Sequence, residues 1–431
     1  MKVRTRFAPS PTGHVHIGNI RTAIYNWLFA RHHDGEFLLR LEDTDRERST
    51  EEAVQVVRDA MDWFALDVDQ EPVYQSQSLD AHLEAAEQLL SSGLAYKADK
   101  GGTGQGEAII FRMPEEAVQF NDLVKGTLQK KAEHMQDMVI VRSNGTPVFH
   151  LANVIDDINM GITHVIRGDD HVENTFRHIA LYKALGAPLP EFAHLPMIVN
   201  KQGKPYSKRD GDAFVGDFRE KGYFSEALFN YLVLLGWSAG DDQEIFVKSE
   251  LVEKFSFSGC QSSPAQMDLR KLEWMNGEYL RALPDETYRQ GVLEALHLAD
   301  ENMDCVDGVL DLLRERIRFY HDAPKMSAYF FSDDFPVDEK SVRKRIDKEG
   351  VPELLGEVST MLNGLDAFTA DVIDQALCNF AEVKDVSPGK LNPAIRVAVT
   401  GQGGGPDLVN ILEILGKETV LKRLAAYSSV D

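Results

Sequence analysis

The chain has few cysteines, no long apolar run and a deficit of positive charge. Its three cysteines, Cys260, Cys305 and Cys378, lie dozens of residues apart, and no Cys-x-x-Cys pair occurs. This spacing argues against a zinc knuckle and a disulfide framework, and it favours buried thiols in a reducing compartment. No stretch reaches the roughly 18 uninterrupted apolar residues of a membrane helix, and residues 1–6 lack the apolar core of a signal peptide. We therefore expect a cytoplasmic protein with no membrane partner.

Acidic residues outnumber basic ones by 69 to 46, so the formal net charge is −23. This balance argues against sequence-independent coating of nucleic acid, which needs a broadly positive surface. It permits a local basic surface that grips one particular RNA. The apolar fraction of 43% is ordinary for a packed protein. At about 150 residues per domain, the length of 431 residues predicts roughly three domains.

The first half of the chain alternates between strand and helix patterns. Apolar side chains at a two-residue period predict strands, and an apolar stripe at helical spacing begins at Ile17. We expect strands over residues 3–7, 37–41, 164–167 and 197–199, and helices from Ile17, near 50–64, near 78–92 and around Phe176–Ala180. Alternation of this kind predicts a parallel sheet with right-handed crossovers.

A glycine-rich stretch and a helical second half complete the pattern. Gly101–Gly106 lacks the Lys-Ser/Thr ending of a phosphate loop and precedes a strand rather than a helix, so we predict a connector. Beyond about residue 213 the pattern is helical almost to the end, apart from the turn at Gly401–Gly405. The expected architecture is an α/β body with an insertion, followed by an all-α second half.

Two loops suit a ligand that carries phosphate. Ser10–Asn19 connects the first strand to the first helix, where backbone N–H groups and the helix dipole attract an anion, and it contains His14 and His16. Ser207–Arg209 ends a loop rich in lysine and glycine, whose cations suit the charge that develops on a phosphate during transfer. Solvated side chains explain either loop when it is taken alone.

Three charged residues form the third candidate site. Arg6, Glu42 and Arg167 each stand at the carboxyl end of a predicted strand or just beyond it. Ligands of open α/β sheets bind along that edge. Two guanidinium groups and one carboxylate complement a molecule with two carboxylates and one ammonium group, which describes glutamate. A structural ion-pair cluster is the alternative interpretation.

Several segments match one known pattern, in order along the chain. They read RFAPSPTG at 6–13, HIGN at 16–19, RLEDTD at 40–45, RGDDH at 167–171, YSKR at 206–209, EAL at 226–228, GW at 236–237 and RVAVTG at 396–401. On these segments the chain resembles bacterial glutamyl-tRNA synthetases nearly end to end. The HIGN and YSKR segments stand in the places of the two class I signatures.

The resemblance implies a fold and a division into domains. It implies an α/β protein with a Rossmann-type parallel-sheet catalytic domain over residues 1–81 and 150–208, an inserted α+β connective and acceptor-binding domain over 82–149, a helical stem-contact domain over 209–282 and an all-α anticodon-binding region over 283–431. The implied enzyme is a glutamate–tRNA ligase of the class I type. It activates L-glutamate with ATP to glutamyl-adenylate and transfers the glutamyl group to the 3'-terminal adenosine of tRNA(Glu). Mg²⁺ is expected to arrive with ATP, and we expect a monomer.

Matching positions also imply roles for individual residues. The implied catalytic residues are His16 and Lys208. The implied ATP-binding residues are His16, Gly18, Asp170, Ser207 and Lys208. The implied glutamate-binding residues are Arg6, Ser10, Glu42, Phe149, Asn153 and Arg167. Which arginine binds which carboxylate stays open. Arg316 falls near the place of a base-reading arginine in the anticodon-binding region.

The chain departs from the family pattern at three places. No cysteine stands in the insertion near Lys97–Gly106, where many relatives carry a zinc knuckle, so we expect no structural zinc. Pro205 stands where the second signature usually begins with a lysine, and its ring fixes φ. Phe149 stands where the pocket often has a tyrosine, which removes one hydrogen bond worth about 1 kcal/mol.

Other functions remain open at this point. An enzyme that glutamylates a tRNA nucleoside resembles only the catalytic half, and the long helical second half counts against it. An enzyme for glutamine is disfavoured by the opening Pro9–Thr12. An inactive paralogue that binds tRNA or another protein is favoured by Pro205 and Phe149 alone. The sequence leaves open whether tRNA(Gln) is charged as well.

Overall fold

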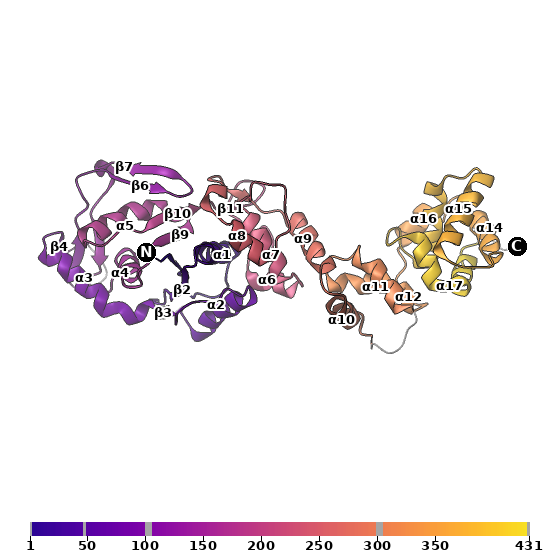
Figure 1. The fold of residues 1–431 in the computed structure, drawn as a ribbon, viewed down its shortest axis with the longest axis horizontal. Coiled ribbons are helices and arrows are strands. Elements are labelled where there is room, and N and C mark those ends of the chain that lie inside the picture. The colour runs from indigo at the N-terminus through magenta and orange to yellow at the C-terminus, as the bar shows by residue number, and fades with distance from the viewer. Residues whose placement is uncertain (1, 46–48, 100–105, 299–304, 429–431) are drawn as a thin grey trace. The chain divides into compact units, whose positions relative to one another are not determined.

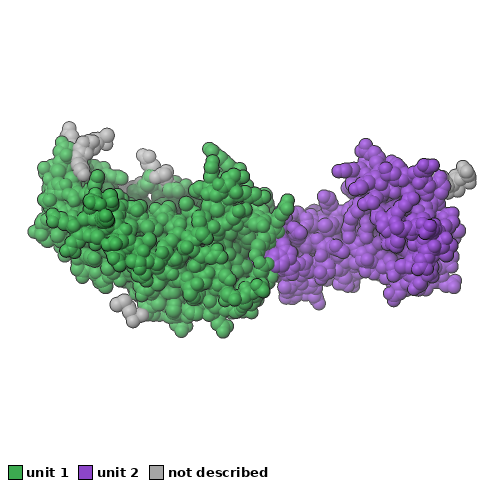
Figure 2. Space-filling view, turned by 90° about the horizontal axis from the view of Figure 1, so that it is seen from above, with its two compact units in different colours: residues 1–272 green, residues 273–431 purple. Residues whose placement is uncertain are grey.

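The computed structural model describes residues 2–45, 49–99, 106–298 and 305–428. The chain divides into two compact units, Met1–Leu272 and Glu273–Asp431, which are green and purple in Figure 2. Residues 101–105, where the sequence predicts most of the glycine-rich connector, lie outside the described residues.

The first unit alternates between strands and helices, as the sequence predicts (Figure 1). Its strands are β1 (Arg4–Phe7), β2 (Glu36–Leu41), β3 (Val73–Tyr74), β4 (Ala95–Ala98), β5 (Ala108–Phe111), β6 (Val118–Asp122), β7 (Gly126–Lys130), β8 (Met138–Val141), β9 (His164–Gly168), β10 (Glu191–Leu195), β11 (Ile198–Val199) and β12 (Ala265–Gln266). Its α-helices are α1 (Ile17–His32), α2 (Glu51–Trp63), α3 (Leu79–Ser91), α4 (Phe149–Asn159), α5 (Val172–Ala184), α6 (Val215–Glu220), α7 (Ser225–Leu234) and α8 (Lys248–Lys254), and the unit boundary falls within α9 (Leu269–Arg281).

Parallel strands form the centre of the first unit, which confirms the predicted α/β fold with a parallel sheet. β1, β2 and β3 pair in parallel, and β9, β10 and β6 do likewise, with β7 antiparallel at the edge. The two sets lie side by side, because Thr163, just before β9, donates its backbone N–H to the Arg4 carbonyl at 3.0 Å. A separate antiparallel sheet of β4, β5 and β8 packs with α3 and α4.

The first helix begins where the sequence predicts because a histidine caps it. His16 keeps an extended backbone, and its Nδ1 accepts a hydrogen bond from the backbone N–H of Gly18 at 3.1 Å. Ile20, Ile24 and Leu28 on the predicted stripe are fully buried, where α1 packs against β1, β2, β9 and α7. The core therefore fixes α1 with its N-terminus at the end of the sheet.

Two strands of the central sheet, β10 and β6, were not predicted from the sequence. β10 reads EFAHL, and its last four residues are all buried, so no two-residue period marks it. β6 lies inside the segment 82–149 that the sequence assigns to an insertion, yet it pairs with β10, where Phe192 is in register with Asp122. The hairpin of β6 and β7 thus brings residues of the predicted insertion to the central sheet.

The second unit is helical throughout its described residues, as the sequence predicts. Its helices are α10 (Asp285–Leu296), α11 (Val306–Arg314), α12 (Ala323–Phe331), α13 (Glu339–Arg345), α14 (Val351–Asn363), α15 (Ala370–Val383), α16 (Pro388–Thr400) and α17 (Leu408–Ala425). Buried side chains of α14 to α17 form one core. The predicted glycine turn ends α16, and Gly401 has φ 70°, a conformation that favours glycine.

Candidate active site

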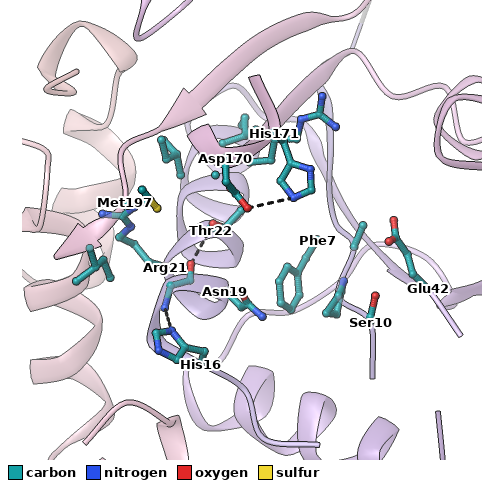
Figure 3. A pocket seen from close by; sticks show the side chains of 18 of the residues that line it. Phe7, Ser10, His16, Asn19, Arg21, Thr22, Glu42, Asp170, His171 and Met197 are labelled. Carbon is teal, nitrogen blue, oxygen red and sulfur yellow. Dashed lines mark hydrogen bonds and ion pairs between the residues drawn. The ribbon is translucent and has the colours of Figure 1, made fainter. Parts of the chain in front are cut away.

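A cavity of about 540 Å³ opens at the carboxyl ends of the central strands. Its lining includes the ends of β1, β2, β9 and β10 together with the start of α1, which is where ligands of open α/β sheets bind. Nine of the residues selected from the sequence line it: Arg6, Ser10, His16, Gly18, Glu42, Phe149, Asn153, Arg167 and Asp170. Figure 3 shows Ser10 and Glu42 on one side of the view and His16 and Arg21 on the other.

Ser207 and Lys208 lie beside this cavity rather than in its lining. Tyr206 and Pro205, which precede them, do line it. The Lys208 Nζ lies 5.1 Å from the centroid of the Phe214 ring, and the His16 ring lies 6.0 Å from the same ring. The two signature segments therefore meet at one aromatic side chain. Lys208 is exposed at the surface of the loop.

The first half of the cavity floor is a cluster of ion pairs around Asp157. Arg6 holds the Asp157 carboxylate through Nε at 2.9 Å and Nη2 at 3.3 Å. Arg40 reaches Asp157 Oδ1 at 2.6 Å and Glu42 Oε1 at 3.2 Å. Burial opposes the charged carboxylate, but the two arginines outweigh it and lower the pKa of Asp157. Arg6 is therefore paired in place through two of its five N–H donors, and the two on Nη1 and one on Nη2 have no partner among the described residues.

Arg40 is held by more carboxylates than Arg6. Besides Asp157 and Glu42, its Nε lies 3.9 Å from Asp156 Oδ2. Burial disfavours its charge, yet Asp157, Glu42 and Asp156 outweigh burial and raise the pKa of Arg40. Arg40 is fully buried and is absent from the cavity lining. It holds the carboxylates of Glu42, Asp156 and Asp157 from outside the cavity.

Glu42 is the carboxylate of this cluster that reaches the cavity. Its Oε1 accepts hydrogen bonds from Arg40 and from Asn153 Nδ2, the latter at 2.9 Å. Its Oε2 has no partner among the described residues, and its side chain is 10% exposed. An ammonium group in the cavity would find a fixed carboxylate oxygen there.

The second half of the cavity floor carries Arg167 without a carboxylate. Its Nη2 donates to Thr175 Oγ1 at 2.7 Å, its Nη1 lies 3.4 Å from His178 Nδ1, and its Nε lies 3.4 Å from His194 Nε2. No ion pair within the described chain includes Arg167. Burial and the neighbouring Arg6 lower the pKa of Arg167 to about 10. This buried cation lacks a counter-ion.

The part of the cavity at the start of α1 is built from backbone and histidine. Because His16 Nδ1 accepts from Gly18, the neutral ring carries its proton on the other nitrogen, Nε2, and the ring also hydrogen-bonds the Tyr206 backbone. Burial lowers the pKa of His16, which keeps the ring neutral. Gly168 makes room for Asp170, because a Cβ there would lie 2.4 Å from Asp170 Oδ1. The carboxylate of Asp170 can then turn into the cavity.

The sequence analysis missed the residues that hold the site from behind. Arg40 and Asp157 left a signal, since each is a charged residue beside apolar residues of a mostly buried strand or helix. Asp122 and His194 left none. Arg316, selected for the anticodon region, is exposed just after α11 in the second unit. No side-chain group suited to hold a metal ion occurs among the described residues, and no helix found there is long and apolar enough to span a membrane.

Comparisons with known proteins agree with the geometry. A family model described as the catalytic domain of class I tRNA synthetases (E and Q) matches residues 2–103 and 98–274, and a model for an anticodon binding domain matches 274–427. The chain is 39% identical over 467 residues to a glutamate–tRNA ligase of Neisseria meningitidis, covering 99% of this chain and 100% of the relative. It is 40% identical over 463 residues to one of Xylella fastidiosa, covering 99% and 98%.

A solved structure is also similar over the full length. It is a glutamate tRNA ligase from Elizabethkingia meningosepticum in complex with its amino acid, with a TM-score of 0.83, 30% identity and 99% of each chain covered. A glutamate–tRNA synthetase from Elizabethkingia anophelis matches with the same TM-score and identity.

Proposed function

The chain belongs to the glutamate–tRNA ligase family of class I tRNA synthetases, and on this premise we propose how its own residues perform the ligation. The observation that carries the proposal is that a carboxylate and a cation line opposite parts of the same cavity. Among the described residues, Glu42 has one carboxylate oxygen without a partner, and Arg167, across the cavity, has no carboxylate partner. Glutamate carries an ammonium group that complements the Glu42 carboxylate and a carboxylate that complements the Arg167 cation.

The chemistry has two steps. An oxygen of the glutamate α-carboxylate attacks the α-phosphorus of ATP, which forms glutamyl-adenylate and releases pyrophosphate. A ribose hydroxyl of the 3'-terminal adenosine of tRNA(Glu) then attacks the activated carbonyl and releases AMP. Both steps need positioning and charge stabilisation more than a protein nucleophile.

Arg167 binds the γ-carboxylate of glutamate and Glu42 binds its ammonium group. A carboxylate in a full ion pair with a buried guanidinium is a weak nucleophile, so the unpaired cation suits the carboxylate that does not react. Asp157 takes one N–H from Nε and one from Nη2 of Arg6, so the charge of Arg6 is already paired, and its remaining N–H groups orient the reacting α-carboxylate. Ser10 and Asn153 complete the contacts, and Phe149 lines the same cavity.

ATP lies along the start of α1. The dipole of the helix N-terminus attracts its phosphates, Gly18 has no side chain in their way, and the neutral His16 ring lies beside them. Asp170 approaches the ribose, and Ser207 and Lys208 close over the triphosphate from their exposed loop. Mg²⁺ enters as a complex with ATP, held by phosphate oxygens and water.

The tRNA contacts follow the expected division of the chain. Residues 82–149 bind the acceptor arm, 209–282 contact the stem and 283–431 read the anticodon, with Arg316 as one base-contacting residue. The match of an anticodon-binding model to 274–427 supports the last assignment. We place the protein in the cytoplasm as a monomer.

The test is aminoacylation with purified protein, ATP, Mg²⁺ and [¹⁴C]glutamate, with tRNA(Glu) and tRNA(Gln) assayed side by side. Charging of tRNA(Glu) is expected. Failure to form glutamyl-tRNA on either tRNA at any enzyme concentration would contradict the proposal. Lys208→Ala should lower the rate of adenylate formation by about 100-fold while the KM for ATP changes little, because charge on the phosphates is greatest in the transition state. Equal losses in kcat and ATP affinity would contradict that role.

A further inference from the structure

Two buried polar residues lie directly behind Arg167, and the reaction outlined above uses neither of them. His194 on β10 is fully buried, and Asp122 on β6 is 2% exposed. We infer that Asp122 and His194 are positioning residues, which aim the Arg167 guanidinium while leaving its positive charge for the substrate carboxylate. This inference rests on the proposed function and deepens it.

The Asp122 carboxylate has a fixed orientation. Its Oδ1 accepts backbone N–H groups from Val124 at 3.0 Å, Lys125 at 2.9 Å and His194 at 3.2 Å. Its Oδ2 lies 2.6 Å from His194 Nδ1. Although burial opposes the ionised form, His194 and the backbone donors hold the pKa of Asp122 below its usual value. An ionised carboxylate only accepts hydrogen bonds, so the proton between the two side chains belongs to His194 Nδ1.

This arrangement sets the tautomer of His194. With its proton on Nδ1, the neutral ring presents a lone pair at Nε2. That lone pair faces Thr175 Oγ1 at 2.8 Å and Arg167 Nε at 3.4 Å. Burial, together with the charge of Arg167, lowers the pKa of His194 although Asp122 raises it, so the ring stays neutral beside the arginine. His194 thus accepts from Arg167 without offering it a counter-charge.

The donor count of Arg167 shows what remains for a ligand. A guanidinium has five N–H donors. Three of them face neutral acceptors on His194, His178 and Thr175. One N–H on each Nη is left, and Arg167 lines the cavity. Two parallel donors on one cation form the bidentate pattern that a carboxylate prefers. A carboxylate in place of His194 would occupy and neutralise the same cation.

The critical variant is Asp122→Asn, because its amide can take only one orientation. The oxygen that accepts three backbone N–H groups must remain an oxygen, so the NH₂ group faces His194 Nδ1. That donor forces the His194 proton onto Nε2, where it opposes the Arg167 Nε–H. The volume and the backbone bonds stay the same, while the acceptor for Arg167 is lost.

The readout is the KM for glutamate against the KM for ATP, measured by tRNA-dependent pyrophosphate exchange. We expect Asp122→Asn to raise the glutamate KM by about tenfold or more, as for loss of one hydrogen bond to a charged group, while the KM for ATP stays within about twofold. The matched control is Asp137→Asn. Asp137 also accepts a backbone N–H, from Met113 at 2.9 Å, but it has no contact with the site, and both KM values should stay at the wild-type level.

A pair of variants at position 194 gives an independent test. His194→Gln keeps an acceptor near the place of Nε2, and His194→Phe keeps the ring without an acceptor. The glutamate KM should rise more in the Phe variant than in the Gln variant, at equal tRNA affinity. If Asp122→Asn does not fold, this pair decides alone.

A wild-type glutamate KM in Asp122→Asn, or equal KM values in the two variants at position 194, would overturn the inference. So would a parallel rise of the KM values for glutamate and ATP. The wild-type protein is assayed first. If it does not charge tRNA with glutamate, the proposed function fails. If it does and the variants behave like wild type, only the positioning role fails.

Discussion

Two buried arginines at the cavity, Arg40 and Arg167, have opposite electrostatic surroundings. Arg40 is fully buried and lies within 4 Å of three carboxylates, those of Asp157, Glu42 and Asp156. Arg167 is 7% exposed and meets only hydroxyl and imidazole acceptors among the described residues. The carboxylates raise the pKa of Arg40 despite burial, whereas burial lowers the pKa of Arg167 to about 10.

This difference separates a structural charge from a functional one. In the Arg40 half, Asp157 is compensated by two arginines before any ligand arrives, so we expect its removal to destabilise the fold. In the Arg167 half the cation has no carboxylate partner among the described residues, which costs stability, and under the proposed function it gains one when the substrate carboxylate binds. Substitutions in the Arg40 half should therefore lower the free energy of unfolding, whereas substitutions in the Arg167 half should raise the KM for glutamate.

The largest expected effect is on stability, from Asp157→Asn. The substitution leaves Arg6 and Arg40 without their shared counter-ion in a buried place, so we expect the free energy of unfolding to fall by about 3–5 kcal/mol. Urea denaturation followed by circular dichroism measures it. A loss below about 1 kcal/mol would show that the ion-pair half is not structural.

Arg167→Gln should produce the opposite pattern. Loss of the cation removes the partner of a buried substrate carboxylate, which costs about 2–4 kcal/mol of binding, or roughly 30- to 1000-fold in glutamate KM. The free energy of unfolding should change little or rise, because no ion pair is broken. Pyrophosphate exchange gives the KM, and tRNA affinity serves as the control. An unchanged glutamate KM would remove Arg167 from the pocket.

Glu42→Gln should affect both the glutamate KM and, to a smaller extent, the free energy of unfolding. It removes the carboxylate that faces the ammonium group, so the glutamate KM should rise by about 10- to 30-fold, as for one hydrogen bond between charged groups. Arg40 keeps Asp157 at 2.6 Å, so stability should change less than in Asp157→Asn. A stability loss as large as that of Asp157→Asn would place Glu42 with the structural charges.

The smallest effect is a pH dependence of stability. Burial and Arg6 lower the pKa of Arg167 from its ordinary value to about 10 in the folded protein. Between these values the unfolded chain binds a proton that the folded chain has lost, so stability rises with pH. From pH 9 to 11 the unfolding free energy of wild type should gain about 1 kcal/mol relative to Arg167→Gln. Parallel curves for the two proteins would mean that Arg167 keeps an ordinary pKa.

The sequence predicts three of the cavity residues because each stands at the carboxyl end of a strand or just beyond it, whereas Ser10, Phe149, Asn153 and Asp170 were selected on the family resemblance. Arg6, Glu42 and Arg167 were selected from strand ends, and the parallel sheet brings all three to one cavity. HIGN was placed at a helix start, and His16 does cap α1. Local pattern was sufficient for these residues, since the topology of a parallel sheet fixes where strand ends meet.

The supporting residues could not be predicted in the same way. Arg6 and Asp157 are 151 residues apart in sequence, and Asp122 and His194 are 72 apart. Their contacts depend on strand pairing and helix register that no local period encodes. β10 has no alternation because both of its faces are buried. Because β6 and β10 were not predicted, the contact between Asp122 and His194 could not be predicted either.

The most direct test of the account is the structure of the protein with glutamate bound. The account predicts one carboxylate of the ligand about 2.7–2.9 Å from the Nη atoms of Arg167, with the ammonium group at Glu42 and the Asp157 ion pairs unchanged. Glutamate bound with Arg167 in contact with neither carboxylate, or with Asp157 released from Arg6 and Arg40 to make room for it, would contradict it.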